Sequence, residues 1–110
     1  MPDNTLQEQP IYSDLGDDER LCDLVEMFVD EMPQRIGQLT TAFDAEDSQE
    51  IGRLAHQMKG SVGSYGFHQL TPYAARLERA VIDGEPRQTI QEILSELSDV
   101  CTRVRTGVPE

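Results

Sequence analysis

Apolar residues recur along the chain every three to four positions, a spacing that predicts amphipathic α-helices rather than strands. Four such runs are separated by short polar stretches that contain glycine, proline or aspartate. No segment alternates with the two-residue period of a strand. The apolar positions that define the four runs are Leu21, Leu24, Val25, Phe28, Met32, Ile36, Leu39 and Phe43; Ile51, Leu54, Ala55, Met58, Val62 and Tyr65; Leu70, Tyr73, Ala74, Leu77 and Val81; and Ile90, Ile93, Leu94, Leu97, Cys101 and Val104.

Local signals mark the expected boundaries of the second helix. Asp47 or Ser48 is suited to the N-cap, and Glu50 completes a sequence that resembles a capping box. Gly66 is a natural terminator, so this helix is predicted over residues 48–65.

Prolines and a turn set the expected limits of the other helices. Pro33 cannot donate a backbone hydrogen bond, so the first helix should kink or restart there. The third helix should begin between Phe67 and Pro72. Before the fourth helix, a turn that starts at Asp83 should place Pro86 at the first helical position.

These elements predict an all-α fold, an antiparallel up-down four-helix bundle with a short N-terminal extension. The bundle is expected to span residues 11–106, with Ile11 and Tyr12 in the extension that covers one end. Residues 1–10 are polar and contain two prolines, which predicts a disordered tail. Residues 107–110 form a short C-terminal tail.

Composition agrees with one small, soluble domain. The chain has 110 residues, of which 37% are apolar and only 5% aromatic, as expected for an aliphatic helical bundle. It has no 18-residue apolar stretch and no basic and apolar leader, so we expect a cytoplasmic protein without membrane association. Cys22 and Cys101 follow no spacing pattern and are expected to be reduced, partly buried thiols.

The charge distribution adds a local feature to an acidic chain. A net charge of −12 argues against binding to nucleic acid, which needs a basic surface. Residues 51–82 nevertheless contain four basic side chains and one acidic side chain. The basic residues are Arg53, Lys59, Arg76 and Arg79, and the acidic one is Glu78. Such a group would favour a phosphoryl group or an acidic partner, although chance clustering would give the same count.

The most informative residue on the second helix is His56. At ~100° per residue it lies ~140° from the centre of the apolar stripe and should point to solvent. On the same outer face lie Gly52, Gly60 and Gly63, and Lys59 is beside them. Each glycine costs a helix roughly 0.5–1 kcal/mol relative to alanine, so helix stability does not explain them. An exposed imidazole in a face without side chains suits a nucleophile that receives an anionic group from another protein.

The residues from this histidine onward resemble the signature of the histidine-containing phosphotransfer (HPt) domain of bacterial phosphorelays. Within that family, the run that begins at Lys59 is most similar to the HPt module of chemotaxis histidine kinases. The similarity covers about residues 51–82. It is carried by His56-Gln-Met-Lys59-Gly60-Ser61, Gly66, Leu70 and Leu77-Glu78.

The resemblance implies a function and a role for each matching residue. His56 would accept a phosphoryl group on Nε2 from a phospho-aspartyl receiver domain or a histidine kinase, and a receiver would take it onward. Lys59 would stabilise the phosphoryl group. Glu78 would bind the other ring nitrogen, although a surface pair with Arg76 or Arg79 is equally open.

The resemblance also implies what kind of protein this is. It would be a monomeric phosphocarrier and not an enzyme by itself, with no cofactor of its own and with Mg²⁺ on the partner receiver. The bare face of Gly52, Gly60 and Gly63 would be the docking face for that receiver. Two alternatives are a helical adaptor that docks on receivers without being phosphorylated, and the substrate module of a larger chemotaxis-type kinase.

Two other kinds of site are not expected. The glycines at 60, 63 and 66 match neither the dinucleotide-binding nor the Walker pattern, and no strand precedes them. A metal site formed by His56, His68 and Glu78 is not expected either, because the short turn after the second helix would not bring them to one face. His68 is expected to be an ordinary surface or interhelix residue.

Overall fold

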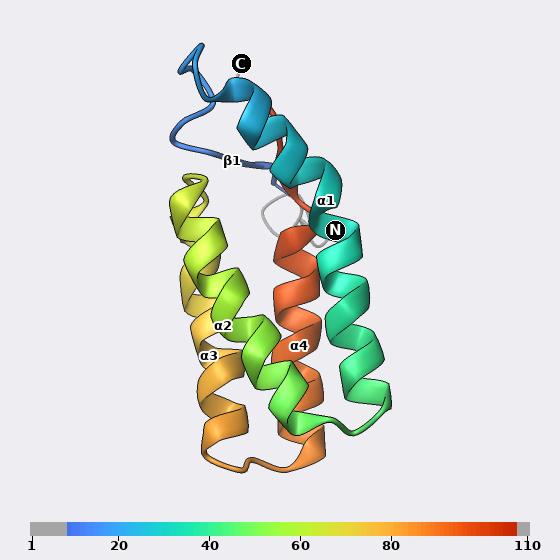
Figure 1. Cartoon of the computed structure of the whole chain (residues 1–110). Coiled ribbons are helices and arrows are strands. Elements are labelled where there is room, and N and C mark those ends of the chain that lie inside the picture. Colours follow the sequence, from blue (N-terminus) through green and yellow to red (C-terminus); the bar gives the residue numbers. More distant parts are fainter. Residues whose placement is uncertain (1–8, 108–110) are drawn as a thin grey trace, which may run out of the picture.

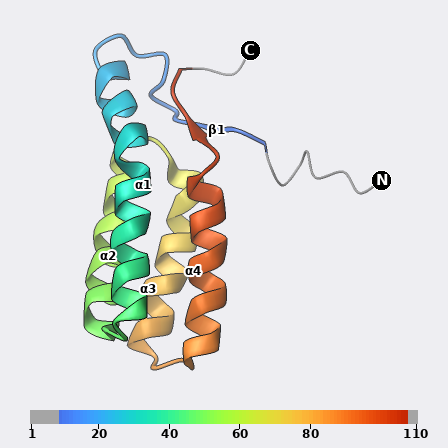
Figure 2. The same cartoon turned by 90° about the vertical axis from the view of Figure 1, so that its right-hand side faces the viewer.

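The computed structural model describes residues 9–107, and the chain forms four long helices in an antiparallel up-down bundle (Figures 1 and 2). The helices are α1 (Cys22–Asp44), α2 (Ser48–Ser64), α3 (Thr71–Ile82) and α4 (Arg87–Cys101), and a 3₁₀ turn (His68–Leu70) precedes α3. The predicted all-α four-helix fold is therefore confirmed. The expected tails, residues 1–10 and 107–110, lie almost entirely outside the described residues. None of the helices in the described part of the chain is long and apolar enough to cross a membrane.

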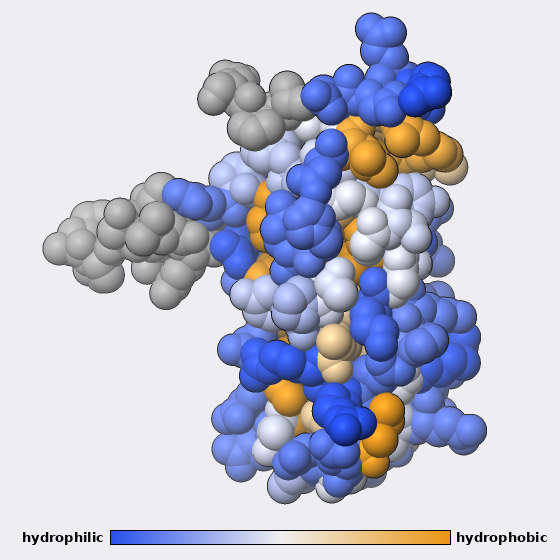
Figure 3. Space-filling model, turned by 90° about the vertical axis from the view of Figure 1, so that its left-hand side faces the viewer, coloured by the Kyte–Doolittle hydropathy of each residue, from blue (hydrophilic) through white to orange (hydrophobic). Residues whose placement is uncertain are grey.

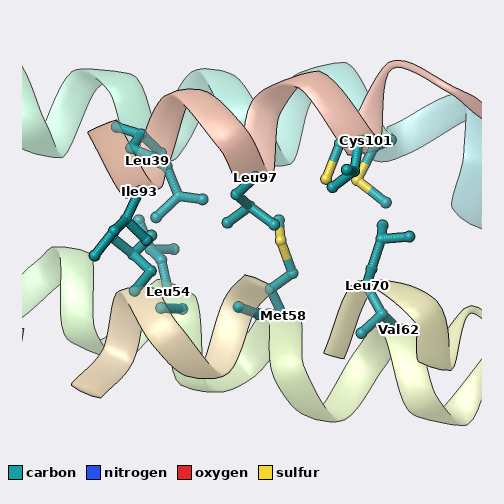
Figure 4. Packing of buried hydrophobic residues seen from close by; sticks show 14 of the residues in the cluster. Leu39, Leu54, Met58, Val62, Leu70, Ile93, Leu97 and Cys101 are labelled. Carbon is teal, nitrogen blue, oxygen red and sulfur yellow. The ribbon is translucent and has the colours of Figure 1, made fainter. Parts of the chain in front are cut away.

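The core consists of the apolar stripes that the sequence pattern identified. Side chains from all four helices meet along the bundle axis and form one buried cluster. Figure 4 shows part of this cluster, including Leu39, Leu54, Met58 and Leu97. Burial of such stripes is the main source of stability for helices of this length. It also fixes the rotation of each helix, and so decides which side chains face solvent.

The sequence predicted a kink or a restart at Pro33, and the first helix does not restart there. α1 is a single helix from Cys22 to Asp44, with Pro33 inside it and exposed. The proline removes one backbone hydrogen bond. Phe28 before it and Leu39 after it are both buried in the same core, and this packing holds the two halves in one helix.

Two short segments near the limits of the described residues form a small parallel ladder that the hydrophobic pattern did not predict. β1 (Ile11–Tyr12) pairs with β2 (Val104–Arg105), with Ile11 opposite Val104. The assignment of Val104 to the fourth helix was wrong, because α4 ends at Cys101 and Val104 is buried in β2. The expectation that Ile11 and Tyr12 cover one end of the bundle is confirmed (Figure 2).

The boundaries of α2 match the sequence signals closely. Oδ1 of Asp47 accepts a hydrogen bond from the backbone N–H of Glu50 at 3.1 Å, so Asp47 is the N-cap. At the other end Gly66 has φ +81°, a left-handed conformation that favours glycine. At the start of α4, Pro86 occupies the N-cap and not the first helical position.

The N-terminal segment binds the turn that follows α2 through Ser13 and Asp14, and we call this contact with Tyr65 and Gly66 the clasp. The hydroxyl of Ser13, a buried polar residue, donates to the carbonyl of Tyr65. The backbone N–H of Asp14 donates to the carbonyl of Gly66 at 3.0 Å. The end of α2 is therefore held by residues more than fifty positions away in the chain.

Candidate functional site

His56 stands in the middle of α2 on the face away from the core. Its neighbour Ala55 is fully buried, whereas the His56 side chain is 67% exposed. The predicted orientation of the imidazole toward solvent is thus confirmed.

One edge of the imidazole is engaged by a residue of α3. Nδ1 of His56 lies 2.7 Å from Oε2 of Glu78, whose side chain is only 17% exposed. A carboxylate can only accept a hydrogen bond, so this contact requires the proton on Nδ1. The other nitrogen, Nε2, then carries a free lone pair in the neutral imidazole.

The same carboxylate also binds the lysine of the site. Nζ of Lys59 donates to Oε1 of Glu78 at 2.7 Å, so the two oxygens of Glu78 serve Lys59 and His56 separately. The hydrogen bond from Lys59 lowers the pKa of Glu78 below its ordinary value; desolvation of the carboxylate opposes this shift, and the contact with His56 adds to it. Glu78 is therefore a carboxylate at neutral pH.

The remaining basic residues of the 51–82 segment are engaged elsewhere. Each contacts an acidic side chain of its own: Glu50 for Arg53 (2.6 Å), Glu96 for Arg76 (3.0 Å) and Asp83 for Arg79 (3.6 Å). The alternative pairing of Glu78 with Arg76 or Arg79 is therefore wrong. The positive charge that the sequence concentrates around His56 is largely balanced by neighbouring carboxylates in the folded protein.

Two of the three glycines on the outer face lie in open space. A Cβ built at Gly60 or Gly63 would meet no atom within 4 Å outside the local helix backbone. Gly52 differs, because its Cβ would contact Cγ1 of Val81 on α3 at 3.4 Å. The placement of Gly52 on the open face needs correction: this glycine faces α3 and lets the two helices approach.

An open hollow of about 680 Å³ lies beside His56. Its walls are formed by Arg35, His56, Gln57, Gly60, Ser61, Ser64 and Tyr65. On the neighbouring side of the molecule, where α2 and α3 lie, the surface is mostly hydrophilic, with a few apolar residues (Figure 3).

Sequence reasoning missed two residues of this hollow. Tyr65 was assigned to the core, but it is only half-buried, and its ring stacks on that of Phe28 with centroids 4.6 Å apart. Arg35 comes from α1 and was not singled out. Its position seven residues after Phe28 was the available signal, because two residues that far apart lie on the same side of a helix.

The other candidates lie outside the site. Nδ1 of the exposed His68 contacts Oδ2 of Asp14 at 2.8 Å, in the clasp at the end of α2. Within residues 9–107 no group of three or more histidine, cysteine or acidic side chains is arranged to hold a metal ion. Cys22 and Cys101 are both free thiols, and burial raises the pKa of Cys101 to about 12.

Comparison with known proteins gives one match. A family model described as the Hpt domain matches residues 23–107, which is more than half of the chain and includes nearly all of the four helices. Neither the curated proteins nor the solved structures that were compared with the chain gave a match.

Proposed function

The chain belongs to the Hpt domain family, whose members carry phosphoryl groups on histidine in phosphorelays, and from this premise we propose that His56 is its phosphoacceptor. The phosphoryl group comes from a phospho-aspartyl receiver domain or a histidine kinase and passes to a receiver domain. The observation that carries this proposal is the contact of Glu78 with Nδ1 of His56, which leaves Nε2 unprotonated on an exposed ring.

The contact supports a balanced transfer step. The lone pair of Nε2 forms a bond to the phosphorus of an aspartyl phosphate while the bond from phosphorus to the aspartyl oxygen breaks. The leaving group is the receiver's carboxylate, and no proton has to move. The product is an imidazolium that keeps its Nδ1–H, and the negative charge of Glu78 lies 2.7 Å from that nitrogen. The reverse step passes the group to the next receiver.

Lys59 and the open glycines support the same reaction. The ammonium of Lys59 has three donors and uses one of them on Glu78, so others are available to phosphoryl oxygens. The empty space above Gly60 and Gly63 lets a receiver approach the ring. We place the Mg²⁺ of this transfer on the receiver and propose no cofactor for the chain itself.

The finer assignments follow from the same residues. A glutamate at position 78 in contact with the imidazole supports a relationship to the HPt modules of chemotaxis kinases. The bundle buries its apolar faces within one chain, leaving only Leu24, Met27 and Ile82 as large exposed apolar residues among those described. This supports a monomer, and we propose that it acts in the cytoplasm.

Transfer from a phosphorylated receiver tests the proposal. The protein is incubated with a ³²P-labelled phospho-receiver and Mg²⁺, and acid-labile, alkali-stable phosphate is measured on it. We expect label on the parent and on His68→Gln, whose histidine belongs to the clasp, and none on a folded His56→Gln. Label on His56→Gln would refute the assignment. Binding to receivers without any label would instead identify the chain as an adaptor.

A further inference from the structure

The two nitrogens of His56 face different surroundings. Nδ1 points to Glu78 on α3, and the ammonium of Lys59 lies on the same carboxylate. The two nitrogens lie on different edges of the ring, so Nε2 points away from this carboxylate. The phosphoryl group would therefore be added on the edge of the ring away from the resting position of Lys59.

The hollow beside His56 brings a second cation to the site. Both α3 and α1 pack against α2 (Figure 1). The hollow joins the outer face of α2 to Arg35 on α1. Among the described residues that line it, Arg35 is the only permanently charged one. Arg53 and Lys59, the cations on α2, are held more tightly, by carboxylates at 2.6 and 2.7 Å.

Arg35 itself is only weakly engaged. Its Nη2 lies 3.3 Å from Oε1 of Glu31, and its Cζ lies 5.0 Å from the ring centroid of Phe28. Its Nε is buried and has no hydrogen-bond partner in the described part of the chain. A buried donor without an acceptor is unfavourable. A move of the guanidinium into the hollow would give up the contacts with Glu31 and Phe28 but would bring Nε to an acceptor.

We infer that Arg35 is a second phosphoryl-binding residue, which binds the group on Nε2 of His56 from the side of α1; this rests on the proposed function. A guanidinium presents parallel N–H donors that match the oxygens of a phosphoryl group. When His56 becomes phosphorylated, the side chain of Arg35 leaves Glu31 and donates to those oxygens. Lys59, from the side of Glu78, and Arg35, from the side of α1, then both donate to the phosphoryl oxygens.

The experiment uses the phosphorylated protein without any receiver. Phosphoramidate is the donor: its P–N bond breaks, ammonia leaves, and the new bond joins phosphorus to Nε2. ³¹P NMR then gives the pKa for loss of the last phosphoryl proton, in the parent and in Arg35→Met. Methionine keeps an unbranched apolar chain over Phe28 but removes the donors. A contact from Arg35 stabilises the dianion, so Arg35→Met should raise this pKa by about 0.5 unit or more.

Arg53→Met is the matched control. Arg53 lies three residues before His56, and its guanidinium is already held by Glu50. We expect little change of the phosphoryl pKa in this variant. We also expect the ¹H–¹⁵N signal of Arg35 Nε–H to move on phosphorylation of the parent. Equal shifts in the two variants would indicate a diffuse field and overturn the inference. If His56 is phosphorylated but the phosphoryl pKa is unchanged in Arg35→Met, the role of Arg35 is overturned and the proposed function stands. If no phosphate appears on His56, both are overturned.

Discussion

Glu78 binds Nδ1 of His56 with Oε2 and the ammonium of Lys59 with Oε1, each at 2.7 Å. One carboxylate of α3 thus fixes the proton on the imidazole and also holds the cation of α2. Because Glu78 is largely shielded from solvent and is ionised, both contacts are charge-assisted. Substitution of Glu78 therefore tests the tautomer of His56 and the position of Lys59 together.

Removal of the carboxylate should disturb the tautomer of His56. In Glu78→Gln the amide oxygen can still accept from Nδ1–H, whereas Glu78→Ala has no acceptor. We expect phosphotransfer to fall by roughly tenfold or more in Glu78→Ala, the effect of one charge-assisted hydrogen bond, and by less in Glu78→Gln. ¹⁵N NMR of the imidazole should show mainly Nδ1–H in the parent and a mixture in Glu78→Ala. Identical spectra would mean that Glu78 does not select the tautomer.

The lowered pKa of Glu78 predicts a pH dependence of stability. A carboxyl whose pKa is lower in the folded state stabilises the fold above its unfolded pKa of about 4.3, and this contribution disappears as the pH falls through the folded value. The free energy of unfolding of the parent, minus that of Glu78→Gln, should therefore be larger at about pH 7 than at about pH 3. Urea denaturation of both proteins measures it. A difference independent of pH would show that Glu78 titrates alike in both states.

The local parts of this structure could be read from the sequence. The cap at Asp47, the end of α2 near Gly66 and the outward direction of His56 depend on residues a few positions apart, and the helical period fixes them. His56 and Lys59 share a helix face for the same reason. At Pro33 the sequence left a kink or a restart open, and the core on both sides of the proline keeps α1 a single helix.

The parts that the sequence could not give depend on contacts between distant segments. β1 and β2 have two residues each, too few for a detectable alternation, and they pair across almost the whole chain. Gly52 and Gly60 each lie four residues from His56, so helical position assigned both to its face, and only the packing of Val81 against Gly52 separates them. The place of Arg35 in the hollow beside His56 likewise depends on how α1 and α2 are aligned, and the helical period of each helix does not fix that alignment.

The open glycines predict opposite effects on stability and on function. Gly60→Ala and Gly63→Ala should each stabilise the protein by roughly 0.5–1 kcal/mol, because alanine is the better helix former and its Cβ meets nothing. Gly60→Leu and Gly63→Leu should also keep the fold, yet slow phosphotransfer with a receiver by about tenfold or more, since a loss of ~1.4 kcal/mol in docking is enough. Thermal unfolding and transfer rates measure the two effects.

Gly52 provides the control for this prediction. Its Cβ would already touch Val81, so Gly52→Leu should lower the melting temperature. Unaffected transfer in Gly60→Leu and Gly63→Leu would show that the bare face does not serve docking.

The clasp at the end of α2 predicts a strong requirement for Gly66. Its φ of +81° is costly for any residue with a Cβ, and such a Cβ would collide with the side chain of Ser13. Gly84 has a similar φ of +68° but nothing within 4 Å of its Cβ position. Gly84→Ala should therefore cost about 1–2 kcal/mol, the backbone term alone. Gly66→Ala should lower the free energy of unfolding, measured by chemical denaturation, clearly more than Gly84→Ala does. Equal losses in the two variants would mean that Ser13 and its neighbours move aside at no cost.

Lys59 can act on His56 in two ways that respond differently to salt. As a direct ligand of the phosphoryl group it makes one charge-assisted contact, worth roughly 1.5–3 kcal/mol. As part of a diffuse field that steers an acidic receiver, its effect would be screened within ~8–10 Å at ordinary ionic strength. Arg76 is the matched comparison, because it is a cation of the same segment and is paired with Glu96 on α4.

We expect Lys59→Ala to slow phosphotransfer about tenfold or more at every salt concentration, since a short-range contact is lost. Arg76→Ala should change the rate little at physiological salt, because its charge is already balanced and its side chain is largely exposed. Transfer rates and the half-life of the phosphohistidine, measured for both variants from low to moderately high ionic strength, separate the two roles. Matching losses that fade with added salt would remove Lys59 from the site and leave it in a diffuse field, and the carboxylate of Glu78 would then be its only specific partner.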